Sequence, residues 1–238
     1  MPYPGLTEWT VRCRSGVFGR SAWSLAPSAG RPTAAILFLD AELYLDRVGA
    51  PAVVRRLQER RAIPPAVAVF LSDGGPTARH EDFICRPDYA RFAACDLVGS
   101  VREEHPGVTE IVIAGLSLSG LAAAYAATRH PAVFRAAVCQ SPSFWWERGR
   151  FAQELPAATP AGPEFWISVG SRETEAGLSH PPSGLRQELT QVAGCVSAVA
   201  ALRTKGYRVS YREYDGGHDP ECWRDNLSGA LPWVLRRG

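Results

Sequence analysis

The sequence predicts an α/β fold in which a mostly parallel central sheet carries helices on both of its faces. Short apolar runs such as Ala66–Leu71 lack the alternation of a half-exposed strand, and continuous runs of this kind are typical of strands buried on both faces. These runs alternate along the chain with segments of helical length, which is the order that builds a parallel sheet. A chain of 238 residues suits one such domain, so we expect a single domain over residues 1–238.

Eight segments are predicted as strands because each is short, rich in apolar or β-branched residues, and bounded by polar or glycine-containing stretches. The first two flank a glycine-containing turn, and the third is apolar almost throughout and ends at Asp40. In chain order the predicted strands are Val11–Arg14, Ser21–Leu25, Thr33–Leu39, Ala66–Leu71, Thr109–Ala114, Ala136–Cys139, Glu164–Val169 and Tyr207–Tyr214.

Five segments are predicted as helices. The first has proline in its first turn and charges along one side, and the second repeats apolar residues near helical spacing. The third is rich in alanine and closes at a His-Pro pair. In chain order the predicted helices are Pro51–Arg61, Asp88–Glu104, Leu121–Arg129, Gly184–Thr204 and Trp223–Leu235. The stretches Phe151–Gly162 and Thr174–Ser183 are predicted as surface loops, and each is a candidate for shaping a pocket.

The junction between a predicted strand and the alanine-rich helix carries a serine in a Gly115-x-Ser117-x-Ser119-Gly120 pattern. A strand, a sharp turn and a helix with serine at the apex are the context of a nucleophile elbow. Small residues around the serine allow the backbone to crowd its neighbours. The usual pattern has glycine where this chain has Ser119, and Gly120 is expected to supply the room. The alternative is an ordinary strand–helix turn in which Ser117 is a helix N-cap.

A base and an acid for that serine are found at the ends of later strands. His218 follows two glycines after a predicted strand, and an imidazole is suited to take the proton of a serine. Such a base needs a carboxylate to orient it. Glu173 gives the order serine, acid, histidine expected for an elbow of this kind. Glu175 and Asp215 remain alternatives.

Two backbone N–H groups are candidates for an oxyanion hole, which stabilises the charge of a tetrahedral intermediate. The first is that of Leu118, directly after the serine. The second is that of Ala41, in the loop after an early strand. The alternative for this loop is that Asp40 only caps the next turn.

Aromatic and basic side chains near the predicted strand ends are candidates for substrate binding. Trp145 and Trp146 suit an aromatic or acyl group, and Arg79 and Arg172 suit an anionic one. For each of these residues a structural role, in packing or in pairing with a nearby carboxylate, is an alternative.

Composition bears on partners and location. A formal net charge of +2 gives no electrostatic case for nucleic acid or a membrane surface. We expect no transmembrane helix and no signal peptide, and therefore a cytoplasmic protein. The six cysteines show no metal-ligand spacing, so no metal and no cofactor are expected. A homodimer stays open.

Taken together, these motifs resemble the esterase family that contains enterochelin (ferric enterobactin) esterases, S-formylglutathione hydrolases and mycolyltransferases, and most of all its enterochelin esterase branch. The resemblance runs from about Ala35 to the C-terminus. The segments that carry it are Phe38–Glu42, Arg79-x-x-Asp82-Phe83, Ala114–Ala123, Cys139–Trp146, Val169–Glu173, Tyr214–Asp219 and Trp223-Arg224.

The resemblance implies an α/β-hydrolase fold and a serine esterase. Residue by residue, it implies Ser117 as nucleophile, His218 as base, Glu173 as acid, and the N–H groups of Leu118 and Ala41 as oxyanion donors. The family usually has glycine at the positions of Ala41 and Ser119. The partner it implies is a small-molecule ester or lactone substrate, of the siderophore type. An acyltransferase or thioesterase of a biosynthetic pathway, and a non-catalytic binding protein of the same fold, remain alternatives.

Overall fold

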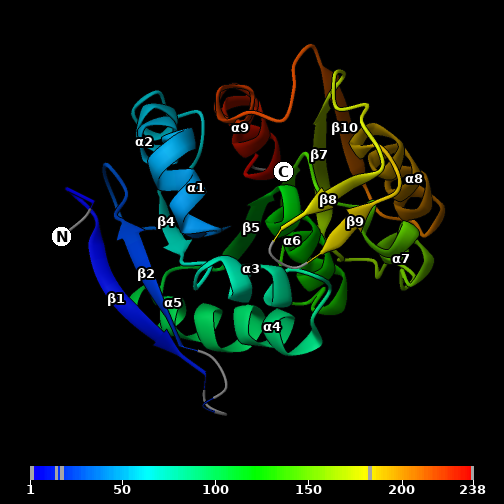
Figure 1. Ribbon diagram of the computed structural model, residues 1–238. Coiled ribbons are helices and arrows are strands. Elements are labelled where there is room, and N and C mark those ends of the chain that lie inside the picture. Colours follow the sequence, from blue (N-terminus) through cyan, green and yellow to red (C-terminus); the bar gives the residue numbers. More distant parts are fainter. Residues whose placement is uncertain (1–2, 14–15, 17–18, 182–183, 237–238) are drawn as a thin grey trace.

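The computed structural model describes residues 3–13, 16, 19–181 and 184–236. Its central sheet has eight strands in the order β1-β2-β4-β3-β5-β6-β7-β10 (Figure 1). The strands from β4 to β10 in this order are parallel, and β1 and β2 form an antiparallel hairpin that joins the sheet against β4. The predicted α/β class with a mostly parallel sheet is confirmed.

The strands of the large sheet agree closely with the predicted segments, because the parallel strands other than the edge strand β10 are apolar runs buried on both faces. Their bounds are β1 Thr7–Arg12, β2 Gly19–Leu25, β3 Ala34–Leu39, β4 Ala66–Leu71, β5 Glu110–Leu116, β6 Ala136–Gln140, β7 Glu164–Gly170 and β10 Val209–Tyr214. The first strand begins earlier than the predicted Val11–Arg14, and residue 14 lies outside the described residues.

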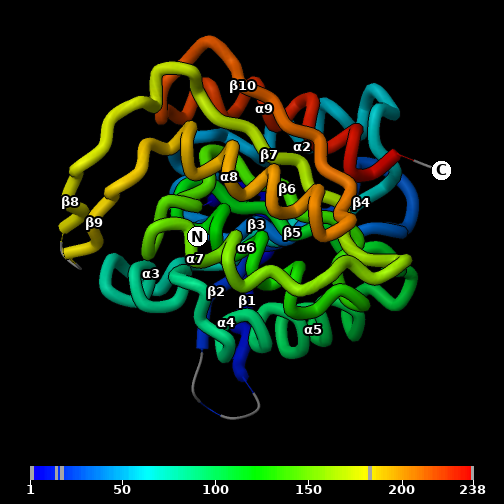
Figure 2. Tube along the Cα trace, turned by 90° about the vertical axis from the view of Figure 1, so that its right-hand side faces the viewer, coloured from blue at the N-terminus to red at the C-terminus, as the bar shows by residue number. Residues whose placement is uncertain are grey.

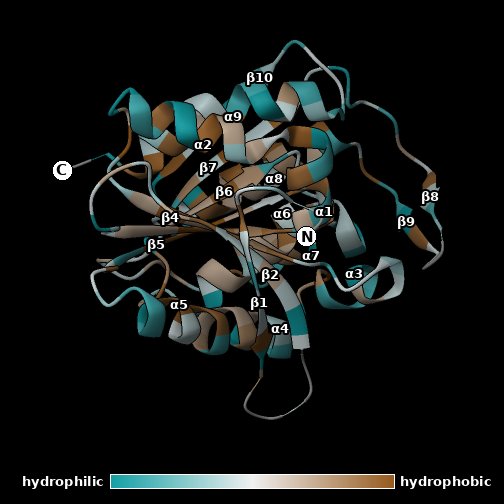
Figure 3. Ribbon diagram, turned by 90° about the vertical axis from the view of Figure 1, so that its left-hand side faces the viewer, coloured by the Kyte–Doolittle hydropathy of each residue, from teal (hydrophilic) through white to brown (hydrophobic). Residues whose placement is uncertain are grey.

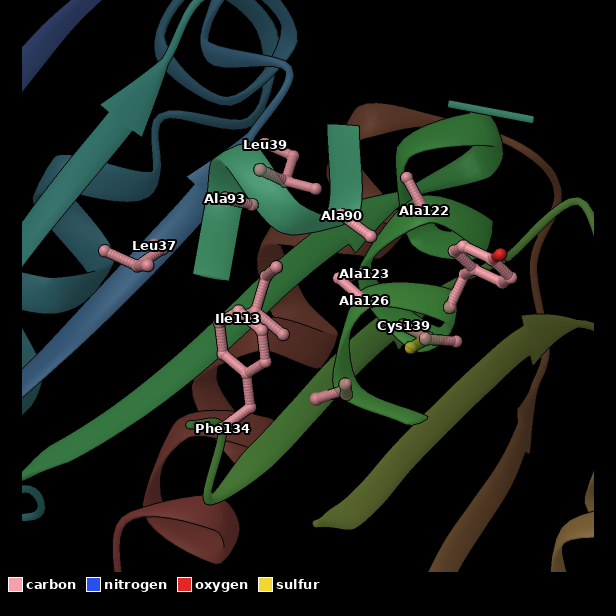
Figure 4. Packing of buried hydrophobic residues seen from close by; sticks show 14 of the residues in the cluster. Leu37, Leu39, Ala90, Ala93, Ile113, Ala122, Ala123, Ala126, Phe134 and Cys139 are labelled. Atoms are coloured by element: carbon pink, nitrogen blue, oxygen red, sulfur yellow. The ribbon is translucent and has the colours of Figure 1, made fainter. Parts of the chain in front are cut away.

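Alternate residues of the strands build two separate cores, one on each face. On β3, for example, Leu37 packs with the helices of one face and Phe38 with those of the other. Figure 4 shows Leu37, Leu39 and Ile113 of the strands together with alanines of the neighbouring helices, all of which belong to one of these cores. Apolar residues concentrate in the sheet and polar ones on the outer helices (Figure 3).

One face is covered by α1 Ala41–Leu43, its π-helical continuation Tyr44–Val48, α2 Ala50–Glu59 and α9 Pro220–Val234. The other face is covered by α4 Pro87–Arg91, the π-helical Phe92–Leu97, α5 Val98–Glu104, α6 Ser117–Arg129 and α8 Gln191–Thr204. Three further helical segments, α3 Pro76–Asp82, the 3₁₀ turn Trp146–Arg148 and α7 Arg150–Gln153, lie in the connections.

The predicted helix Gly184–Thr204 is wrong in its first part. Helix α8 begins only at Gln191, because Thr190 is its N-cap. The Thr190 hydroxyl accepts a hydrogen bond from the Ala193 N–H, and the helix does not extend to earlier residues. The residues before it form strand β9, Leu185–Gln187, which pairs antiparallel with β8, Leu178–His180.

The predicted loops need similar corrections. The stretch Thr174–Ser183 contains β8, so it is not a plain loop, and Figure 2 shows the β8–β9 hairpin standing out from the body of the fold. The stretch Phe151–Gly162 begins inside α7. Helix α3 was not predicted, although Pro76 at its first turn is a start signal. Helix α6 begins at Ser117 rather than at Leu121.

Candidate active site

The strand–helix junction at Ser117 is a strained turn. Ser117 has a φ of 53°, in the left-handed region that non-glycine residues rarely adopt. A Cβ atom on Gly115 would lie only 2.1 Å from the Ser119 carbonyl oxygen, so only glycine lets the helix start this close to the strand. Strain of this kind clusters at functional sites and persists only where the surroundings enforce it. Ser117 is the first residue of α6 and Leu116 is the N-cap, so the alternative in which Ser117 is the N-cap is wrong.

Ser119 and Gly120, where the chain departs from the usual elbow pattern, each have a defined role in the turn. Ser119 is fully buried, and its hydroxyl donates to the Leu116 carbonyl and accepts from the Leu116 N–H, at 2.7 and 2.9 Å. Gly120 faces Pro142, whose Cβ would lie 3.0 Å from an added Cβ. Gly120 therefore gives the room that was expected of it, and Ser119 closes the turn by hydrogen bonds.

His218 and Glu173 are joined directly. His218 Nδ1 lies 2.6 Å from Glu173 Oε2. The Glu173 side chain is 3% exposed and its other oxygen accepts from the Gly170 N–H at 2.7 Å, so the carboxylate is fixed. A histidine whose Nδ1 is engaged in this way presents Nε2 as the free nitrogen.

The other carboxylates near His218 have different partners. Asp215 pairs with Arg172 at 2.6 Å, and its side chain is 90% exposed. Asp219 accepts from the Cys222 N–H and caps helix α9. Glu175 lines the cavity described below, and its carbonyl accepts from the Gln187 amide. Of these acids, Glu173 is the one that the structure brings to the imidazole.

The loop after β3 places Ala41 at the start of α1. Asp40 before it has a φ of 71° and is fully buried. Its side chain makes no cap to the turn but accepts two hydrogen bonds from the Arg79 guanidinium, at 2.8 and 2.6 Å. Burial raises the pKa of the Asp40 carboxyl, and the positive charge of Arg79 opposes that rise. The N–H of Leu118 belongs to the first turn of α6.

A cavity of about 250 Å³ contains the residues of this site. Ser117, Glu173 and His218 line it together, and the described residues include no hydrogen bond between Ser117 and His218. Catalytic hydrogen bonds are commonly long in a substrate-free enzyme and tighten when substrate binds. The complete lining is Ser117, Ser143, Trp145, Arg172, Glu173, Glu175, Leu178, His180, Gln187, Gln191 and His218.

The four predicted substrate-binding residues separate into two groups. Trp145 and Arg172 line the cavity. Trp146 lines a different depression on the surface, with the Arg150 guanidinium over its ring. Arg79 lies outside the lining and is engaged with Asp40.

Sequence reasoning missed the wall that the β8–β9 hairpin and the start of α8 contribute. The His180 ring stacks on Trp145, with 5.0 Å between ring centroids and 12° between planes. His180 Nε2 lies 3.1 Å from the Gln187 amide oxygen, and Gln191 accepts from the Trp145 indole at 2.6 Å. The proline after His180 indicated only a loop, and nothing in the sequence places that segment against Trp145.

One acidic group in the described ranges has oxygens close enough together for a cation, namely Asp40, Glu42 and Asp73. Four of its oxygens accept hydrogen bonds from protein donors, whereas Asp40 Oδ1 is buried without a partner among the described residues. Arg79 binds Asp40, Ser72 and the Asp73 N–H bind Glu42, and the Gly75 N–H binds Asp73. These hydrogen bonds hold the three carboxylates together at the ends of β3 and β4. Within the part of the chain that the structure describes, no helix combines the length and apolar character needed to cross a bilayer.

Comparison with known proteins gives a family and a fold. The model of a family described as "Putative esterase" matches residues 21–234. Iron(III) enterobactin esterase of Escherichia coli K12 is 28% identical over 215 residues, which cover 87% of this chain and 50% of that protein. The chain thus spans about half the length of the curated relatives it matches.

Solved structures agree on the architecture. The enterobactin esterase of Shigella flexneri, crystallised in the presence of enterobactin, superposes with a TM-score of 0.81 at 24% identity, over 96% of this chain and 58% of that one. A siderophore hydrolase from Aspergillus nidulans gives a TM-score of 0.73 at 16% identity, over 98% and 95%. Identities this low show the fold alone, and the expected α/β-hydrolase fold is confirmed.

Proposed function

Because this chain belongs to the "Putative esterase" family, we propose that it is a serine carboxylic ester hydrolase that works through an acyl-enzyme. In this proposal Ser117 is the nucleophile, His218 the general base and acid, and Glu173 the carboxylate that orients the imidazole. The N–H groups of Leu118 and Ala41 are the oxyanion donors. Residues 1–238 act as one catalytic domain.

One observation carries the proposal. A serine held at a φ of 53° at the carboxyl end of a parallel strand shares a cavity with a histidine that is bonded to a buried glutamate. A serine without such a base is a weak nucleophile, and a histidine without such an acid takes no fixed tautomer. The strain at Ser117 has no packing purpose that a glycine would not serve better.

The reaction follows from these groups. Ser117 Oγ attacks the ester carbonyl carbon while His218 Nε2 takes the hydroxyl proton, and the carbonyl oxygen becomes an oxyanion held by the two N–H groups. The bond to the leaving alcohol breaks as His218 returns the proton to it. Water then attacks the acyl-enzyme with the same base, and the acid product and free Ser117 are released.

For the substrate we propose a siderophore-type ester or lactone. The support is the names of the relatives, iron(III) enterobactin esterase among them, together with an aromatic wall of Trp145 and His180 beside the proposed nucleophile. A flat aromatic surface of this kind suits an aromatic acyl group.

Substitution of Ser117 by alanine tests the proposal. Ser117→Ala is expected to fold normally and to lose hydrolysis of p-nitrophenyl butyrate, since the nucleophile is gone. A fluorophosphonate is expected to label the wild type at Ser117, as located by mass spectrometry, and to leave the variant unlabelled. Wild-type rates in the variant, or an adduct elsewhere, would refute the assignment.

The same assay separates hydrolysis from acyl transfer, which uses the same triad. An alcohol or amine acceptor is added, and the products are identified. If the acceptor carries the acyl group in most turnovers, the enzyme is a transferase and the hydrolase proposal is wrong. Acid product independent of the acceptor supports hydrolysis. The siderophore proposal is tested by adding iron-free and ferric catecholate trilactones to the ester panel.

A further inference from the structure

Ser141 lies at the end of β6, behind the proposed triad, and no role has so far been assigned to it. It is fully buried and has a φ of 43°, a conformation that favours glycine. The chain nevertheless places a residue with a side chain here, at a cost in backbone strain. An outlier of this kind points to a function for the side chain.

The hydrogen bonds of Ser141 fix the direction of its proton. Trp223 Nε1 lies 3.1 Å from Ser141 Oγ, and because an indole N–H only donates, the serine oxygen accepts this bond. Two acceptors are within reach of the single hydroxyl proton of Ser141, namely Glu173 Oε1 at 2.6 Å and the Tyr214 hydroxyl oxygen at 3.2 Å. The carboxylate is the nearer of the two and accepts only, whereas the Tyr214 hydroxyl has a proton of its own to donate. Ser141 therefore donates a short, charge-assisted hydrogen bond to the carboxylate.

Glu173 uses its two oxygens for different tasks. Oε1 accepts from Ser141 and from the Gly170 N–H, and Oε2 meets His218 Nδ1. With two donors on Oε1 the carboxyl group cannot turn about its last bond without losing both. The plane of the carboxylate, and with it the direction in which one oxygen faces the imidazole, is thereby fixed.

Elements far apart in the sequence hold Ser141 in its strained conformation. Its N–H donates to the Ser168 carbonyl of β7 at 2.6 Å, and its carbonyl accepts from the Gln191 amide at the start of α8. The Trp223 ring of α9, which donates to Ser141, also stands edge-on to the His218 ring, with 4.8 Å between centroids. Trp223 therefore contacts both Ser141, which binds the Glu173 carboxylate, and the His218 ring.

We propose that Ser141 is a positioning residue, whose hydroxyl holds the Glu173 carboxylate in the orientation that serves His218. The proposal rests on the proposed function, in which Glu173 and His218 act together. Ser141 itself touches no reacting atom. Its role is to keep the imidazole in one tautomer and one orientation through Glu173.

Two variants separate this role from a purely structural one. Ser141→Gly removes the hydroxyl and relieves the positive φ, whereas Ser141→Ala removes the hydroxyl and keeps the strain. The expected thermal stabilities therefore differ, with the glycine variant the more stable. Both variants are expected to lose about 10–100-fold in kcat, with KM within about twofold of the wild type. Loss of the outer partner that orients a functional group, as known for the partners of metal ligands, typically costs this much activity. Arg61→Gly, at an exposed residue with a φ of 54° remote from the cavity, is the matched control for relief of strain.

A second readout is independent of any ester. The proton on His218 Nδ1 is followed by proton NMR as a downfield resonance, assigned by its loss in His218→Asn. This resonance is expected to shift or broaden in both Ser141 variants and to stay in place in Arg61→Gly. An unchanged resonance overturns the proposal, and so does an unchanged kcat in an active enzyme. If the wild type hydrolyses no ester, the proposed function fails, and the resonance alone decides the role of Ser141.

Discussion

Replacing Gly115 by alanine tests whether the proposed nucleophile depends on the close approach of β5 and α6. A Cβ atom at this position would lie 2.1 Å from the Ser119 carbonyl oxygen, 2.3 Å from its carbonyl carbon and 2.7 Å from the Gly120 nitrogen. All three are backbone atoms, so no side-chain rotation relieves the clash. An ordinary contact of about 3.4 Å requires the start of the helix to move by about 1.3 Å.

This movement is expected to lower both activity and stability. A misplacement of about 1 Å at a reacting group costs on the order of 100-fold in rate, so kcat/KM of Gly115→Ala for p-nitrophenyl butyrate should fall at least that far. This loss corresponds to about 2.7 kcal/mol. Overpacking costs about 1–3 kcal/mol of folding stability, and each kcal/mol lowers Tm by about 2–4 °C in a chain of this size.

Steady-state kinetics and thermal unfolding measure the two effects, and Gly99→Ala is the matched control. Gly99 lies inside α5, where an added Cβ meets nothing within 4 Å. The same substitution there should leave kcat/KM unchanged and raise stability by up to about 1 kcal/mol, because alanine is the better helix former. A Gly115→Ala enzyme with wild-type rate and Tm would refute the reasoning.

Two further predictions concern carboxylates. Glu173→Gln should lower kcat by about 10³–10⁴-fold, as expected when the orienting acid of a triad is neutralised. Asp215→Asn should keep kcat within about threefold of the wild type, because Asp215 is 90% exposed and faces Arg172. Equal losses of kcat in the two variants would contradict the choice of Glu173. The hydrogen bond from the Cys222 N–H lowers the pKa of Asp219 from its usual 3.8. The charged Asp219 cap therefore stabilises α9 fully above pH 3.8, and this stabilisation is lost as the pH falls through the lower pKa of the folded state. The Tm difference between wild type and Asp219→Asn should therefore shrink between pH 7 and pH 3 in thermal unfolding, and a constant difference would count against a role for the charge.

The inner parallel strands were predictable because both of their faces are buried. Ala34–Leu39 and Ala66–Leu71 are apolar at every position, and a pattern without alternation leaves little choice of structure. The start of α8 was not predictable from the same signal. The residues before Thr190 form β9 only because β8 pairs with them, and that pairing lies outside any local pattern.

Side-chain partners were predictable only where the order of motifs implied them. Glu173 and His218 follow strands whose carboxyl ends share one edge of the sheet, so their meeting is a consequence of topology. Arg79 has no such constraint. Its pairing with the buried Asp40, 39 residues earlier, depends on how α3 folds back over the loop after β3, and the sequence does not specify that.

Ser119 shows how a departure from a motif can be compatible with the geometry that the motif encodes. The crowding at the turn falls on Gly115, which faces the helix backbone, and on Gly120, which faces Pro142. Position 119 instead points back at Leu116, where a hydroxyl both donates to the carbonyl and accepts from the N–H. A glycine there would leave these two buried groups to other partners, and a buried polar group without one destabilises the fold. The serine therefore supports the strained turn from inside, while the glycines on either side of it provide the space.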